Sequence, residues 1–154
     1  MMSDAAAARP TGLVHQIDRV RAALEATPLS IVQLLARLGV GAVFFKSGLT
    51  KIASWEFTLM LFRDEYRVPL LPPEIAAPIA TATELSMPIL LVLGLFTRLA
   101  TLPLLGMILV IQLFVYPDSW AEHLTWLALL LLILTRGPGA ISLDRIISAT
   151  FFRA

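Results

Sequence analysis

The chain has 154 residues, of which 58% are hydrophobic, and its mean hydropathy is +0.82. These values are typical of a single-domain integral membrane protein, and they exclude an ordinary soluble core of this size. The net charge of +1 gives no support for a nucleic-acid partner, and the absence of cysteine excludes thiol–disulfide chemistry and cysteine-ligated metal sites on this chain.

Residues 1–28 are expected to form an N-terminal amphipathic segment. The first ten residues lack the apolar stretch behind a basic start that marks a cleaved signal peptide. The next part repeats apolar residues at helical spacing: Leu13, Ile17, Val20 and Leu24. We predict a helix that lies in the membrane interface, with a partner-binding helix as the alternative.

Four apolar stretches follow, and each is interpreted as a transmembrane helix: residues 29–46, 75–96, 99–116 and 120–135. The fourth stretch is short for a bilayer, which local thinning or packing against longer neighbours can accommodate. Together they predict an all-α fold in which an integral membrane four-helix bundle occupies residues 29–136.

Two further interfacial helices are expected outside these spans. Residues 51–74 mix aromatic and charged side chains, which predicts a short helix that covers one mouth of the bundle. Residues 137–139 break the last span, and Ser142 can cap a final amphipathic helix within residues 137–154.

Basic residues predict the orientation in the membrane. If the N-terminus is cytoplasmic, that side receives the larger group: Arg9, Arg19, Arg21, Arg98, Arg136, Arg145 and Arg153. The other side receives the smaller group: Lys46, Lys51, Arg63 and Arg67. Because loops rich in lysine and arginine stay inside, we expect both termini to be cytoplasmic.

Two opposite charges fall near the middle of successive spans, Arg37 in the first and Glu84 in the second. An unpaired charge at a helix centre costs about 2.5–3.5 kcal/mol on insertion scales. Successive spans run antiparallel, so we predict a midplane ion pair between Arg37 and Glu84. The pair either fixes the helix register or takes part in binding or proton handling, which makes Glu84 the candidate catalytic residue. Pro88 frees the backbone carbonyl of Glu84 in the same helical turn.

Several other polar residues are candidate ligand or partner contacts: Lys51, Thr81, Arg98, Gln112 and His123. Lys51 can snorkel to the interface or contact an anion. Gln112 can form a hydrogen bond between helices. His123, beside Glu122, is expected to be an exposed interfacial histidine, and the alternative is a proton relay at the outer face.

The same residues form a recurring pattern. It runs Arg37-x3-Gly41-x2-Phe44-x3-Gly48-x2-Lys51, then Glu84, then Gly94-x2-Thr97-Arg98, then Gly137-Pro138-Gly139-x2-Ser142-Leu143-Asp144. The glycines of the first motif share one helix face and favour close approach of another helix or a ligand. In order and spacing this pattern resembles the DoxX family over residues 30–147, although Ser86-Met87-Pro88 stands where many members have a glycine-rich turn. The resemblance implies a small four-helix protein of the bacterial inner membrane.

Three functions remain open. The resemblance implies an accessory or membrane-anchor subunit of a redox complex, with quinone as the cofactor it would share. The only histidines are His15 and His123, so a haem within the spans lacks axial ligands, and we expect neither an intrinsic cofactor nor a metal site. The alternatives are a non-catalytic scaffold or assembly factor and a small transporter. Membrane lipid, and a protein partner or a second copy of the chain, are the expected partners.

Overall fold

The computed structural model describes residues 12–151, and every regular element within them is a helix. In chain order these are α1 (Gly12–Glu25), α2 (Leu29–Ala53), α3 (Trp55–Leu61), η1 (Phe62–Tyr66), α4 (Pro73–Leu93), α5 (Thr97–Val110), η2 (Ile111–Val115), α6 (Trp120–Arg136) and α7 (Leu143–Phe151). The all-α class is confirmed for this part of the chain. Residues 1–11 and 152–154 lie outside the described residues. The prediction that the N-terminus is not a cleaved signal peptide falls on that part of the chain.

Three helical stretches are long and apolar enough to cross a membrane: Leu29–Ala53, Pro73–Leu93 and Thr97–Val115. They match the first three predicted spans, although α2 continues to Ala53 instead of ending near residue 46. α6 begins at the predicted position but has only 17 residues, so it is shorter than the other three stretches.

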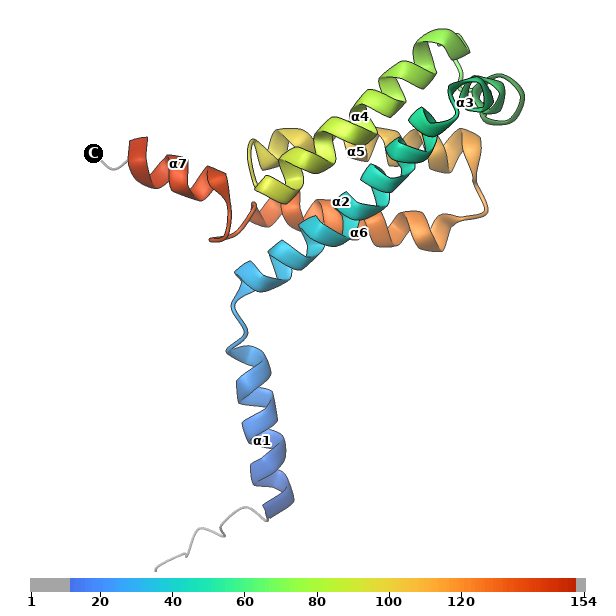
Figure 1. Ribbon diagram of the computed structural model, residues 1–154. Coiled ribbons are helices and arrows are strands. Elements are labelled where there is room, and N and C mark those ends of the chain that lie inside the picture. The colour runs from blue at the N-terminus through green and yellow to red at the C-terminus, as the bar shows by residue number, and fades with distance from the viewer. Residues whose placement is uncertain (1–11, 152–154) are drawn as a thin grey trace, which may run out of the picture.

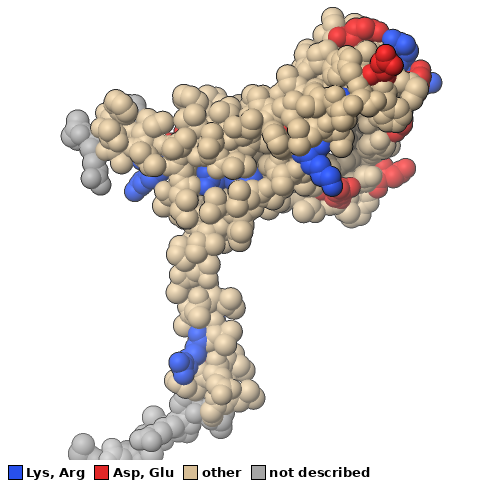
Figure 2. All heavy atoms as spheres, viewed as in Figure 1, with Lys and Arg blue, Asp and Glu red and all other residues tan. Residues whose placement is uncertain are grey.

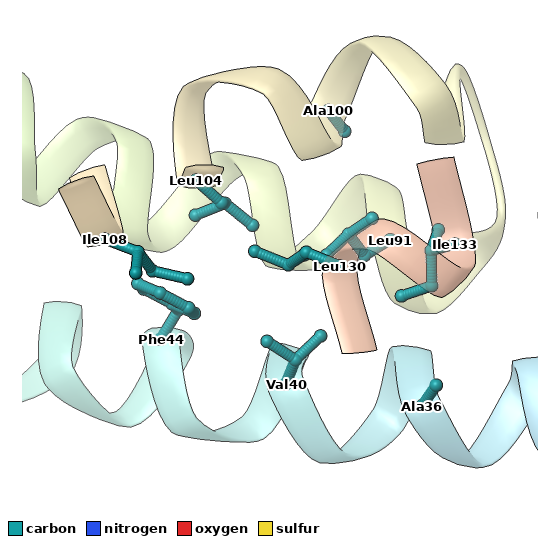
Figure 3. Close-up of a cluster of buried hydrophobic side chains, with 9 residues drawn as sticks. All are labelled: Ala36, Val40, Phe44, Leu91, Ala100, Leu104, Ile108, Leu130 and Ile133. Atoms are coloured by element: carbon teal, nitrogen blue, oxygen red, sulfur yellow. The ribbon is translucent and has the colours of Figure 1, made fainter. Parts of the chain in front are cut away.

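α2, α4, α5 and α6 pack together, and we call them the helical core. α2 contacts α4 and α6, and α5 contacts the same two helices (Figure 1). Its interior is a layer of buried apolar side chains from all four helices (Figure 3): Ala36, Val40, Phe44, Leu91, Ala100, Leu104, Ile108, Leu130 and Ile133. Large apolar side chains also point outward, such as Leu99 and Leu109, which are 65% and 59% exposed. Such a surface is costly in water and suits contact with lipid.

Two glycines set the register between α2 and α4. A Cβ on Gly41 would lie 3.1 Å from Cγ2 of Val92, and a Cβ on Gly48 would lie 2.8 Å from Cδ2 of Leu85 and 3.1 Å from Cβ of Glu84. The close helix packing predicted from the glycine spacing is confirmed. It fixes Gly48, near the end of α2, opposite Glu84.

The remaining helices lie outside the core. α3 and η1 form the helix predicted in the first long loop; α3 contacts α2 and α4, and η1 contacts α4. α1 and α7 bury no residue against the rest of the molecule, and both stand away from the core in Figure 1. In the view of Figure 2, most of the visible acidic atoms gather at the end of the core that carries α3.

Candidate functional site

Glu84 is buried, at 3% exposure, and it is paired with Lys51. Nζ of Lys51 lies 2.9 Å from Oε1 and 2.8 Å from Oε2 of the carboxylate. The hydroxyl of Ser47 donates a hydrogen bond to Oε1 at 3.1 Å and accepts one from the Lys51 ammonium at 2.9 Å. The three side chains therefore form a closed polar cluster, which compensates both charges where neither could be buried alone.

Local sequence explains this cluster. Ser47 and Lys51 are one helical turn apart on α2, so both side chains point to the same side. Gly48 lies between them and lets α4 approach closely enough for Glu84 to reach both. The extension of α2 to Ala53 is also necessary, because it keeps Lys51 inside the helix.

The expected ion pair between Arg37 and Glu84 does not form. Arg37 is fully buried, but its NH2 atom donates to the backbone carbonyl of Ile141. The depth argument placed both charges near the midplane, whereas the packing of α2 on α4 sets Gly48 opposite Glu84. Arg37 lies about three turns, or roughly 16 Å, from Gly48 toward the N-terminus of α2, and its guanidinium is beside Gly94.

Arg37 belongs instead to a group of contacts that fastens the C-terminal loop to the core. Gln33, also on α2, donates to the carbonyls of Arg136 and Gly137, at 3.0 Å each. Asp144 accepts hydrogen bonds from the Phe96 and Thr97 backbone N–H groups at 2.8 and 3.0 Å, and from the Thr97 hydroxyl at 2.8 Å. Asp144 therefore caps the start of α5.

Gly94 holds these contacts together at the α4–α5 turn. It has a φ of +69°, a left-handed conformation that favours glycine, and it ends α4. A Cβ there would collide with the guanidinium of Arg37 and would lie 2.5 Å from Cβ of Ser142. The Arg37, Gly94, Thr97, Ser142 and Asp144 positions of the sequence pattern thus meet in one structural cluster, which we call the C-terminal latch.

A cavity of about 470 Å³ adjoins the Lys51–Glu84 cluster, within the usual size range of small-molecule sites. Ser47, Lys51 and Glu84 line it, and so do Glu122 and His123 from α6. Apolar and aromatic side chains form most of the remaining wall, including Phe44, Phe62, Tyr66, Met107, Tyr116 and Trp126. The cavity is therefore an apolar chamber with polar groups from α2 and α4 and from α6.

His123 lies in the wall of this chamber, so the expectation of an exposed interfacial histidine is wrong. The residue is 4% exposed, and its Nδ1 lies 2.7 Å from Oε1 of Gln112. Gln112 donates its Nε2 to the carbonyl of Pro117 at 2.7 Å, so its oxygen faces the ring and Nδ1 of His123 is the donor. In the neutral ring, Nε2 is then a free acceptor. The hydrogen bond between helices predicted for Gln112 is confirmed.

Aromatic side chains pack along two parts of the chamber wall. The Trp126 ring lies edge-on to Phe44, with a centroid distance of 5.7 Å, and 5.4 Å from the His123 ring. Tyr66 packs edge-on against Tyr116 at 5.9 Å. Burial, together with the 2.8 Å hydrogen bond that Tyr116 donates to Glu65, raises the pKa of the Tyr116 phenol above its usual range.

Part of the chamber wall reaches the surface of the core on α4 and α5. Four of its lining residues are exposed or half-buried there: Ile79 and Thr83 on α4, and Pro103 and Gly106 on α5. A Cβ added to Gly106 would meet no heavy atom within 4 Å. Because both helices belong to stretches that are long and apolar enough to cross a membrane, this part of the wall lies on the surface that suits lipid.

The other predicted contacts lie elsewhere. Thr81 is buried on α4, but it does not line the chamber and its hydroxyl has no partner in the described structure. Arg98 is exposed at the latch end of the core, where it lines a second cleft. Sequence reasoning missed Ser47, Tyr66 and Tyr116. Only Ser47 carried a usable signal, its one-turn spacing from Lys51.

A metal centre finds no support in the described residues. Among residues 12–151, no group of three or more His, Asp or Glu side chains lies close enough to hold a metal ion. The chamber offers hydrogen-bond donors and acceptors suited to a neutral ligand with polar edges: an ammonium, a hydroxyl, a carboxylate and an imidazole.

The long apolar helices and the lipid-like outer surface define a helical membrane protein. Residues 32–117 match the family model described as DoxX, and the chain belongs to the DoxX family. It is also similar to a protein of Haemophilus influenzae described as "Uncharacterized protein", with 30% identity over 128 residues, which covers 77% of this chain and 84% of that one. No solved structure matches the chain. The matched region contains Lys51 and Glu84 and ends before α6.

Proposed function

We propose that the chain is a membrane accessory subunit of a redox complex and that its chamber binds a quinone head group. One observation carries the proposal: an apolar chamber between long apolar helices has hydrogen-bonding groups from α2 and α4 and again from α6. Quinones are flat rings with a carbonyl oxygen at each of two opposite edges, and they dissolve in the bilayer. Aromatic walls and two separate polar positions are what such a ring needs.

The residues present fit this head group. Lys51 and Ser47 carry donors that can turn toward a carbonyl oxygen, while Glu84 keeps the ammonium charge compensated. The free Nε2 of His123 is an acceptor, so at that edge of the ring it suits the hydroxyl of the reduced quinol form. A bound quinone would supply the two-electron chemistry that no residue of this chain supplies. The electrons therefore pass to or from a partner protein.

We further propose that α6 is the fourth span of a four-helix bundle in a bacterial inner membrane. Its 17 residues correspond to roughly 26 Å of helix, close to the ~30 Å thickness of the hydrocarbon core, and it packs along α5 and α2. Four spans return the chain to the side where it started. The basic residues favour the cytoplasm for that side, with α1 and α7 in the membrane interface.

Organic extraction of the full chain, purified in mild detergent, tests the quinone site. We expect a near-stoichiometric amount of quinone in the wild-type extract, measured by chromatography. The Glu84→Gln variant should lose it about tenfold, since a charge-assisted hydrogen-bond network is disrupted. Glu74→Gln is the control, because Glu74 is an exposed carboxylate on the same helix. An extract without quinone from stable wild-type protein would contradict the proposal.

Substitutions at two glycines distinguish loss of the ligand from loss of folding. Gly106 and Gly39 both have open space where a Cβ would be added, but only Gly106 lines the chamber. Gly106→Leu should lower quinone content several-fold at an unchanged melting temperature. Gly39→Leu should leave both unchanged, and equal quinone loss in the two variants would remove support for the chamber as the site.

A scaffold or assembly factor is the second candidate function. It is favoured by α1, which exposes its apolar stripe outside the core: Leu13, Ile17, Val20 and Leu24. Such a stripe fits either the membrane interface or an amphipathic partner surface. Co-purification of a defined partner, without quinone in the extract, would favour this function over the first.

A further inference from the structure

A second cleft, of about 720 Å³, lies at the latch end of the helical core. Three arginines from three different helices line it: Arg98 at the start of α5, Arg136 at the end of α6, and Arg145 on α7. We call it the arginine cleft. All three side chains are exposed, and none of them forms an ion pair within residues 12–151.

The positive charge of this cleft is not compensated by its own lining. Asp144 is the one acidic residue that lines it among the described residues. The Asp144 carboxylate already accepts three hydrogen bonds from Phe96 and Thr97 at the start of α5. Three guanidinium groups therefore share a cleft with a single carboxylate, which favours an anion between them.

The position of the cleft favours an amphiphilic anion over a small soluble one. It lies where α2 begins, α4 turns into α5, and α6 ends, which is at the ends of the apolar helices. Three large apolar side chains line the same cleft and are exposed: Leu29 by 50%, Phe96 by 61% and Leu99 by 65%. A small soluble anion would leave them in water. An amphiphile with an anionic head contacts the arginines and these apolar residues together.

We propose that the arginine cleft binds the phosphodiester head group of an anionic phospholipid. The planar guanidinium groups of Arg98, Arg136 and Arg145 hold the phosphate oxygens through paired hydrogen bonds, and the acyl chains lie along Leu29 and Leu99. This site is separate from the chamber, since Lys51 lies at the other end of α2 and pairs there with Glu84 of α4. It is independent of whether the chamber binds quinone.

Lipid binding to the full chain in detergent tests the proposal. The probes are phosphatidylglycerol and zwitterionic phosphatidylcholine, with affinity measured by native mass spectrometry. We expect a clear preference for phosphatidylglycerol in the wild type. Combined substitution of Arg98, Arg136 and Arg145 by Gln should weaken binding on the order of 100-fold, because each basic residue near an anionic head group contributes about fivefold.

The control replaces an equal number of basic residues at the opposite end of the core, Lys46, Arg63 and Arg67, by Gln. It should keep the wild-type preference for phosphatidylglycerol. If the triple arginine variant fails to insert, the single variants each test the same point, with an expected loss of about fivefold. Arg145→Gln suits this purpose best, since α7 buries no residue.

Three results would overturn the proposal. One is phosphatidylglycerol binding that the arginine variants leave unchanged. Another is inorganic phosphate competing as strongly as the lipid, which would assign the cleft to a soluble anion. The third is that the arginine variants lose a co-purifying acidic protein but keep their lipid binding, which would assign the cleft to a protein partner.

Discussion

The two ends of the helical core hold their buried charged side chains in different ways. At one end, Lys51 and Glu84 pair side chain to side chain beside a chamber. At the other, Arg37 donates to the backbone carbonyl of Ile141, and Asp144 caps a neighbouring helix. The first arrangement leaves titratable groups facing a space that a ligand can enter. The second commits its charges to holding the chain in place, so the same sequence pattern contains both a candidate site and a structural latch.

The largest expected effect tests which charges are partners. Lys51→Met leaves the Glu84 carboxylate buried without its cation, which should cost about 3–5 kcal/mol of unfolding free energy. The double variant Lys51→Met/Glu84→Gln should recover most of that loss. Denaturant titration in detergent measures both values.

Arg37→Met provides the comparison for this cycle. Because Arg37 contacts the C-terminal loop and not Glu84, adding Glu84→Gln to it should give no recovery. If Glu84→Gln restored stability to Arg37→Met but not to Lys51→Met, the partner of Glu84 would be Arg37, as expected from depth in the membrane.

Helix class and the position of the first three spans could be predicted from the sequence, but the register between the helices could not. Composition and apolar length predicted the all-α class and the first three spans, and glycine spacing predicted close packing of α2. The partner of Glu84 depended on Gly41 and Gly48 packing against Val92 and Leu85, which is set by tertiary contacts. A shift of three turns changes the partner without changing the hydrophobic pattern.

The burial of His123 was hidden from the sequence for a similar reason. Its hydrogen-bond partner, Gln112, lies in the π-helical turn η2. A π-turn rotates the following side chains away from the positions that a 3.6-residue period assigns to them. Periodicity therefore gave no sign that Gln112 and His123 face each other beside the chamber.

A smaller effect compares glycines at the two ends. Gly94→Ala forces a left-handed residue to carry a Cβ against Arg37 and Ser142, and should cost about 1–3 kcal/mol. Gly48→Ala crowds Leu85 and Cβ of Glu84, but Gly48 has no left-handed φ, so its cost should be smaller. Melting temperatures in one detergent rank the two variants. A larger loss for Gly48→Ala would mean that the latch is the more adaptable end.

The smallest effect concerns the chamber end alone, and it is seen as a pH dependence. Tyr116 donates to Glu65, so Tyr116→Phe should cost about 0.5–1.5 kcal/mol near neutral pH. The folded state raises the pKa of this phenol, mainly through burial, and so favours its neutral form. The resulting stabilisation is complete below the unfolded-state pKa of about 10 and is lost as the pH rises through the higher folded-state value. Unfolding curves between pH 7 and 11 should therefore converge for wild type and Tyr116→Phe, because only the wild type has this contribution to lose. A gap that stays constant with pH would show that folding does not raise the pKa of the Tyr116 phenol.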